Sequence, residues 1–236
     1  MSIKNAFFEF IKESPTAYHA TEAVKKRLVS EGFTQLYEYD SWQLNDGAGY
    51  FVIRSDSSLV AFKYKSYFSG FMMSSSHTDS PSFKIKPSVS SSDLYTKLNV
   101  EKYGGAIHYS WLDRPLSVAG RVFVRCDGGV KSMLVNIDRD VAVIPSVALG
   151  MNHELNSSLT LNVAKDLQPI ISCTDNGGIM SEIADKLCVS ESDIISHDLM
   201  LYNRNAPTSL GLNGELILSP RIDDLSCVFT ALYIGA

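Results

Sequence analysis

The chain has 236 residues, of which 45% are hydrophobic and 20% charged, and its formal net charge is -5. This composition is typical of a soluble globular protein with apolar side chains for one large core or two smaller ones, and it excludes a disordered chain. The acidic balance and the lack of a Lys/Arg cluster exclude nucleic acid as a partner.

The amino-terminal residues and the cysteines indicate a cytoplasmic protein. The apolar start of the chain is interrupted by Glu9, Lys12 and Glu13, so we expect neither a signal sequence nor a membrane span. The four cysteines are widely spaced and form no Cys-x-x-Cys pair, which disfavours both a disulfide framework and a cysteine-based zinc site.

A helix followed by short strands is predicted for the first third of the chain. Ser14 and Pro15 provide an N-cap and a first helical position, and apolar residues at helical spacing continue as far as Gly32. Five segments of strand composition follow, at residues 33–39, 49–54, 59–64, 70–75 and 82–86. The fourth segment consists of small and apolar residues, and we expect it to be a buried strand. The order of these elements predicts an α/β domain.

Residues 77–81, His-Thr-Asp-Ser-Pro, come directly after the fourth of these strands. At the end of a strand the imidazole of His77 can bind a divalent metal, while the carboxylate of Asp79 orients the ring. A polar turn that ends the strand would explain the same residues. The tripeptide alone therefore leaves both readings open.

A β-rich second module is predicted beyond a polar stretch at residues 88–93, which we interpret as a linker. Segments of β character lie at residues 106–111, 116–126, 130–137 and 140–145, and a further one lies within 162–171. Residues 127–129, Asp-Gly-Gly, predict a hairpin turn. One helix is predicted at residues 175–187, with Ile179, Ile183 and Leu187 on one face.

The last part of the chain has a strand at residues 197–202, a polar loop, a strand at 215–219 and then Asp223 and Asp224. An apolar helical face follows, so this carboxylate pair can bind a metal or simply cap the helix. The sequence stops inside that helix. We therefore expect the chain to be the first part of a longer protein.

Three stretches of this sequence, at residues 76–87, 103–122 and 219–225, resemble the aspartyl aminopeptidase family of two-metal peptidases. Weaker matches lie at residues 14–19 and 143–145. The matches follow the family's order from about residue 5 to the end of the chain.

The resemblance implies an α/β metallopeptidase domain, with a mixed sheet and flanking helices, interrupted by a β-rich dimerisation domain. We expect the first part of the catalytic domain at residues 1–91, the inserted domain at 92–204 and the return to the catalytic domain at 205–236. The resemblance also implies homo-oligomers, in which dimers build a dodecamer.

The resemblance further implies a metal-dependent aminopeptidase that removes the N-terminal residue from peptides with a hydroxide activated by two divalent ions, expected to be zinc. His77 takes the place of a metal ligand, Asp79 that of the catalytic carboxylate that orients it, and Asp223 that of the carboxylate bridging both ions. Asp224 stands where many relatives have Asn. The general base and the remaining ligands are expected downstream of residue 236.

One departure from the family's pattern concerns substrate preference. Relatives have a substrate-contacting histidine where this chain has Gly150, and His153 lies three residues further on. A preference for an N-terminal Asp or Glu is therefore left open. Two alternatives to the aminopeptidase also remain: a catalytically inactive oligomeric scaffold of the same fold, and another two-metal hydrolase.

Overall fold

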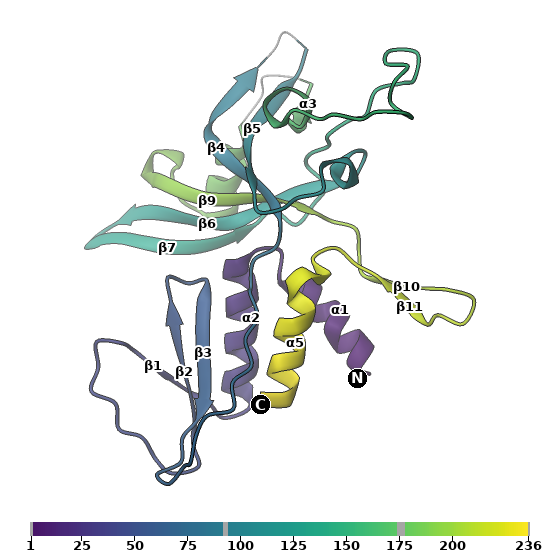
Figure 1. Cartoon of the computed structure of the whole chain (residues 1–236). Coiled ribbons are helices and arrows are strands. Elements are labelled where there is room, and N and C mark those ends of the chain that lie inside the picture. Colours follow the sequence, from purple (N-terminus) through teal and green to yellow (C-terminus); the bar gives the residue numbers. More distant parts are fainter. Residues whose placement is uncertain (1, 92–93, 174–177, 236) are drawn as a thin grey trace. The chain divides into compact units, whose positions relative to one another are not determined.

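The computed structural model describes residues 2–91, 94–173 and 178–235 (Figure 1). These residues form two compact units. The first unit comprises residues 1–80 and 206–236, and the second unit comprises residues 81–205. Both contain strands and helices, so the predicted mixed α/β class is confirmed. None of the helices in the described part of the chain is both long and apolar enough to cross a membrane.

The first unit contains helices α1, α2 and α5, a three-stranded sheet and a hairpin. In the sheet, β1 pairs in parallel with β2, which pairs antiparallel with β3; β10 and β11 form the antiparallel hairpin. The elements are α1 (Ile3–Glu13), α2 (Ala17–Ser30), β1 (Thr34–Leu36), β2 (Gly49–Arg54), β3 (Ser58–Lys63), β10 (Thr208–Leu210), β11 (Leu216–Leu218) and α5 (Ile222–Gly235).

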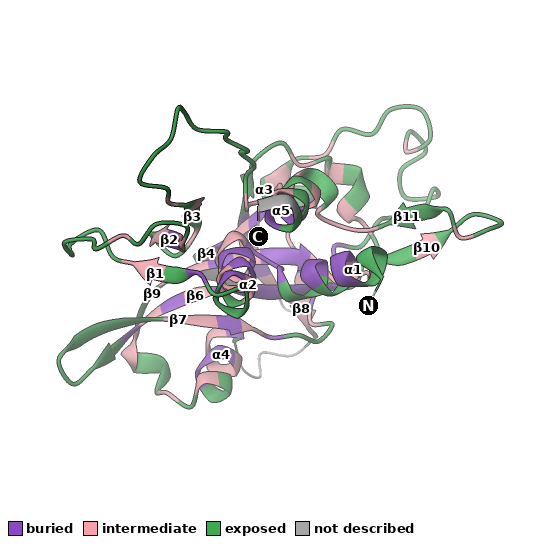
Figure 2. Ribbon diagram, turned by 90° about the horizontal axis from the view of Figure 1, so that it is seen from below, coloured by how far each residue is buried: buried purple, intermediate pink, exposed green. Residues whose placement is uncertain are grey.

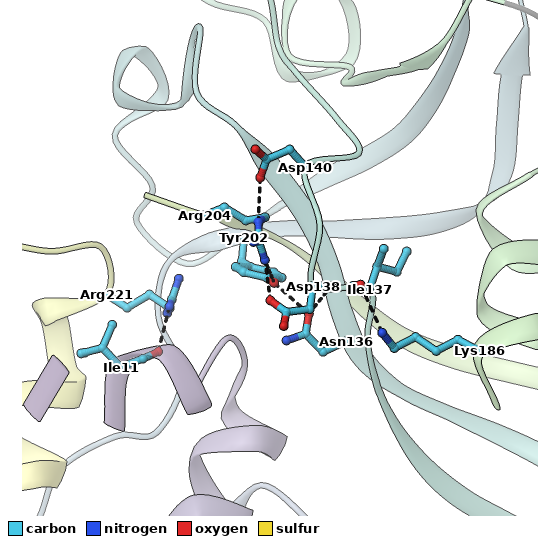
Figure 3. A network of polar contacts seen from close by, with 9 residues as sticks. All are labelled: Ile11, Asn136, Ile137, Asp138, Asp140, Lys186, Tyr202, Arg204 and Arg221. Atoms are coloured by element: carbon cyan, nitrogen blue, oxygen red, sulfur yellow. Dashed lines mark hydrogen bonds and ion pairs between the residues drawn. The ribbon is translucent and has the colours of Figure 1, made fainter. Parts of the chain in front are cut away.

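The helix predicted after Ser14 is confirmed as α2, although Thr16 rather than Ser14 is its N-cap. The buried apolar residues of α2 belong to one core cluster with those of α1 and α5. The ring of Phe229 in α5 lies 5.3 Å from that of Phe7 and 5.8 Å from that of Phe10, both in α1. Arg221, just before α5, donates a hydrogen bond of 2.9 Å to the carbonyl of Ile11 in the last turn of α1 (Figure 3). The start of α5 is thereby tied to α1.

The prediction of a buried strand at residues 70–75 is wrong. These residues have no regular secondary structure, and the side chains of Phe71, Met72 and Met73 are exposed. A strand needs a neighbour for its N–H and C=O groups. Among the described residues no strand pairs with this segment, because the sheet of the first unit is limited to β1, β2 and β3. Apolar composition alone therefore did not decide its structure.

The second unit is built on a six-stranded sheet with the order β7-β6-β9-β4-β5-β8, in which every neighbouring pair is antiparallel (Figure 1). Buried residues are concentrated along the central strands, as Figure 2 shows for β6 and β9. The elements are β4 (Ser82–Ser91), β5 (Thr96–Tyr103), η1 (His108–Trp111), β6 (Leu116–Cys126), β7 (Gly129–Asn136), α3 (Val163–Asp166), β8 (Ile170–Ser172), α4 (Ile179–Leu187), η2 (Glu191–Asp193) and β9 (Ile194–Asn203).

Several local predictions for the second unit need correction. Residues 88–91, expected in a linker, continue strand β4, and residues 92–93 lie outside the described residues. Strand β4 pairs with β5 and β9, and the second unit begins at Pro81. Residues 108–111 form a 3-10 helix instead of a strand. Helix α4 begins at Ile179, and residues 175–177 of the predicted helix lie outside the described residues.

The predicted hairpin at residues 127–129 is confirmed, because β6 and β7 pair up to Cys126 and Gly129. Beyond the other end of this pair, an arginine links the chain after β9 to the chain after β7 (Figure 3). Arg204 contacts Asp140 at 2.7 Å and Asp138 at 2.5 Å. A partly exposed ionic network thus joins the segments that follow β7 and β9 in the second unit.

Candidate metal centre

His77 and two adjacent carboxylates of the first unit lie together. The Nε2 atom of His77 is 3.2 Å from Oδ1 of Asp223 and 3.9 Å from Oδ2 of Asp224. One ligand atom from each of the three residues lies within 4.8 Å of the others, which among the described residues is the one such group of metal-binding side chains. His77 lies after β3 in a segment without regular secondary structure, and the aspartates lie at the start of α5.

The other ring nitrogen of His77 shows which atom is available to a metal. Nδ1 lies 2.9 Å from the carbonyl oxygen of Asp79 and 3.3 Å from a carboxylate oxygen of the same residue. Nδ1 therefore carries the proton and donates to Asp79 in the neutral ring, which leaves the lone pair of Nε2 directed at the aspartates. The structure brings together all three residues that the sequence predicted for the site, His77, Asp79 and Asp223.

Two hydrogen bonds join the His77 turn to the start of α5. The backbone N–H of His77 donates to Oδ2 of Asp224 at 3.1 Å, and the hydroxyl of Ser80 donates to the carbonyl of Asp223 at 2.9 Å. A third hydrogen bond joins the His77 turn to the turn between β2 and β3, because Thr78 donates to the carbonyl of Ser57 at 2.7 Å. These hydrogen bonds therefore hold the His77 turn and the start of α5 next to each other, although the two segments are far apart in the chain.

Negative charge dominates the electrostatics of this group. Partial burial opposes the shift, but the hydrogen bond to the Asp79 carbonyl and the charges of Asp224, Asp79 and Asp223 raise the pKa of His77 above its usual value. A hydrogen bond from the thiol of Cys227 and one from the backbone of His77 lower the pKa of Asp224. The site therefore favours a bound cation, either a proton on the ring or a metal ion.

The donor set fits zinc. One imidazole nitrogen and carboxylate oxygens are ligands that zinc takes, and catalytic zinc sites commonly have three protein ligands and an open position. The side chain of Asp223 is 79% exposed and that of His77 is 53% exposed, whereas that of Asp224 is only 18% exposed. The group is thus open to solvent on the side of His77 and Asp223.

Sequence reasoning missed the contacts of Ser80 and Cys227, and it gave Asp224 no specific partner. The position of Cys227, one helical turn after Asp224, was a signal that could have placed its thiol near that carboxylate. Gly150 and His153, considered for substrate contact, lie in an exposed loop of the second unit. Apart from its chain neighbours, no atom of the described residues lies within 4 Å of the place where a Cβ atom on Gly150 would be.

A model of the family described as "Aminopeptidase I zinc metalloprotease (M18)" matches residues 10–234. The chain belongs to the M18 family. This is the aspartyl aminopeptidase family, so the family predicted from the motifs is confirmed.

Named relatives and solved structures agree with this assignment. A probable M18 family aminopeptidase 2 of Clostridium acetobutylicum is 40% identical over 236 residues, which cover 95% of this chain and 54% of that protein. The structure of the Ape4 and Nbr1 complex matches with a TM-score of 0.91 and 33% identity over 98% of this chain and 49% of that chain. The S. cerevisiae mApe1 dodecamer matches with a TM-score of 0.79 and 26% identity over 98% of this chain and 55% of that chain. The chain therefore spans about half the length of the relatives it matches.

Proposed function

We propose that this chain contributes His77 and Asp223 to the metal centre of a zinc aminopeptidase that removes the N-terminal residue from peptides. The observation that carries the proposal is the 3.2 Å approach of His77 Nε2 to Asp223, with Nδ1 of the same ring held by Asp79. The M18 relatives are named as aminopeptidases, which favours this activity over an inactive scaffold or another two-metal hydrolase.

Each residue has a distinct task in this proposal. His77 binds a zinc ion through Nε2, and Asp79 holds the ring in the tautomer that leaves Nε2 free. Asp223 has two carboxylate oxygens on a largely exposed side chain, so it is suited to bridge two ions. Bound zinc would lower the pKa of a water molecule to about 7 and polarise the scissile carbonyl.

The substrate and the assembly follow from the same family. A peptide with a free amino terminus is the proposed substrate, and a preference for Asp or Glu at that terminus stays open because of Gly150. We assign the second unit as the inserted dimerisation domain and propose a cytoplasmic homo-oligomer that builds a dodecamer. Support for the dodecamer comes from the structural similarity to the mApe1 dodecamer.

Zinc binding tests the metal centre directly. The dissociation constant of zinc is measured by competition with a chromophoric chelator for the wild-type chain and for His77→Ala, Asp223→Ala and Asp185→Ala. Asp185 is an exposed carboxylate on α4 in the second unit, so its variant is a matched control. Removing one of two or three ligands should weaken binding at least about tenfold, by analogy with the effects of perturbing metal ligation. Equal affinities in all four proteins would contradict the proposal.

Activity is tested in the full-length protein with peptides that have either a free or an acetylated amino terminus. Zinc-dependent release of the first residue from the free peptides alone is expected. The His77→Ala and Asp223→Ala variants should lose this release, and Asp185→Ala should retain it. Cleavage of the acetylated peptides at the same rate would indicate a different hydrolase.

A further inference from the structure

Asp224 differs from its neighbour Asp223 in how its carboxylate is used. The side chain of Asp224 is 18% exposed, and its Oδ2 atom lies 3.1 Å from the backbone nitrogen of His77 but 3.9 Å from the ring nitrogen Nε2. The shorter contact is a hydrogen bond to the backbone, and a carboxylate is a strong acceptor for such a bond. The oxygen nearest to the ring is therefore already occupied by the main chain of His77.

The segment that leads into His77 has few anchors of its own. Among the described residues, no backbone–backbone hydrogen bond involves residues 70–77, and the apolar side chains just before His77 are exposed. A segment with few buried contacts and no backbone ladder has little to fix its orientation. The hydrogen bond to Asp224 therefore fixes the main chain at His77 itself, while Thr78 and Ser80 hold the residues that follow it.

The contacts on both sides of His77 together set the direction of its ring. Asp224 holds the backbone N–H, Asp79 holds Nδ1, and these two constraints leave Nε2 facing Asp223 at 3.2 Å. The thiol of Cys227 donates a hydrogen bond to the carboxylate of Asp224 from one turn further along α5. Asp224 is thus itself held by the helix that carries Asp223.

We propose that Asp224 is a positioning residue, which accepts the backbone hydrogen bond of His77 and so places Nε2 opposite Asp223, and that it does not bind the metal. This inference rests on the proposed metal centre at His77 and Asp223. The two aspartates then have different roles: the exposed carboxylate of Asp223 binds the ion, and the less exposed carboxylate of Asp224 fixes the position of His77.

The conservative variant Asp224→Asn separates positioning from ligation. The amide oxygen of Asn can accept the His77 N–H, but the amide lacks the negative charge that a metal-binding carboxylate supplies. We expect zinc affinity within about threefold of the wild type for Asp224→Asn, and at least about tenfold weaker for Asp224→Ala, because a lost metal-orienting contact costs 10–100-fold. Equal losses in both variants, or no loss in Asp224→Ala, would overturn the proposal.

Hydrogen–deuterium exchange of the zinc-free protein provides a readout that needs no metal. Peptides covering residues 71–80 should exchange faster in Asp224→Ala than in the wild type and in Asp224→Asn, whereas peptides from β6 should not change. Unchanged exchange at residues 71–80 in Asp224→Ala would refute the positioning role. If Asp224→Ala does not fold, Asp224→Asn decides alone: retained zinc affinity agrees with the proposal and its loss overturns it.

The His77→Ala titration distinguishes failure of this inference from failure of the proposed function. Unchanged zinc affinity in His77→Ala would reject the metal centre itself, while the exchange experiment would still report on the contact between Asp224 and the backbone of His77. Loss of affinity in His77→Ala together with equal losses in the two Asp224 variants would keep the metal centre and make Asp224 a ligand.

Discussion

Lowering the pH should destabilise the first unit through His19. This residue lies in the first turn of α2, where its Nδ1 atom is 2.8 Å from the hydroxyl of Thr16. Burial and, to a smaller extent, the charge of Lys26 lower the pKa of His19 to about 4. The folded protein therefore keeps the ring neutral under conditions in which the unfolded chain protonates it.

The direction and the size of the effect follow from the two pKa values. Above pH 6.5 the ring is neutral in both states, so the contribution of His19 to folding is fully present. Between pH 6.5 and about 4 only the unfolded chain gains a proton, and stability falls. A pH of 5.0 lies about 1.5 units below the usual histidine pKa of 6.5. At about 1.4 kcal/mol per unit, the free energy of unfolding is therefore about 2 kcal/mol lower at pH 5.0 than at neutral pH.

Urea unfolding at pH 7.5 and pH 5.0, followed by circular dichroism, measures this loss. The decrease in the free energy of unfolding between the two pH values should be about 2 kcal/mol smaller in His19→Gln than in the wild type. His153→Gln is the matched control, because His153 is exposed in the second unit. An identical pH dependence in the wild type and in His19→Gln would refute the assignment of the effect to His19.

Three further predictions concern the stability of the two units. Phe229→Ala should lower the free energy of unfolding by about 3–5 kcal/mol in urea titrations, because this buried ring contacts two phenylalanine rings of α1. Gly120→Ala should reduce the melting temperature, since its Cβ atom would clash with the carbonyl oxygen of Asp198, whereas Gly105→Ala, near which the described chain has only its own neighbours within 4 Å, should not. Arg204→Met should lower the free energy of unfolding by about 1 kcal/mol, because the ion pairs of Arg204 with Asp138 and Asp140 are partly exposed. This difference from the wild type should disappear in high salt.

The parts of the fold that could be predicted from sequence were those whose signals are local. Helix α2 has a capping region and a regular apolar stripe, and the turn between β6 and β7 contains Asp-Gly-Gly. Residues 70–75 have equally clear apolar composition, but a strand exists only with a partner, and no local pattern specifies one. The same reason explains the continuation of β4 through a Ser-rich stretch that was interpreted as a linker.

The candidate site shows a different limit. His77 and Asp223 were predicted because their motifs occur in the order typical of one family, and not because any local pattern joins them. The hydrogen bonds between the two segments connect residues 143 and 147 positions apart, so their meeting depends on the complete fold of the first unit. The hydrogen bond from His77 to Asp224 was not predictable, because it depends on the direction of one side chain at the start of α5.

The charges around His77 favour a cation at this site. The carboxylates of Asp79, Asp223 and Asp224 all approach the same imidazole ring, and like charges at such distances repel one another. Although partial burial opposes the shift, the hydrogen bond to the Asp79 carbonyl and the attraction of the three carboxylates raise the pKa of His77, so a proton on the ring offsets part of this repulsion. A divalent ion would offset more of it and would displace that proton from Nε2. Proton and metal therefore compete for the same position, and the arrangement of the carboxylates that raises the affinity of His77 for one also raises it for the other.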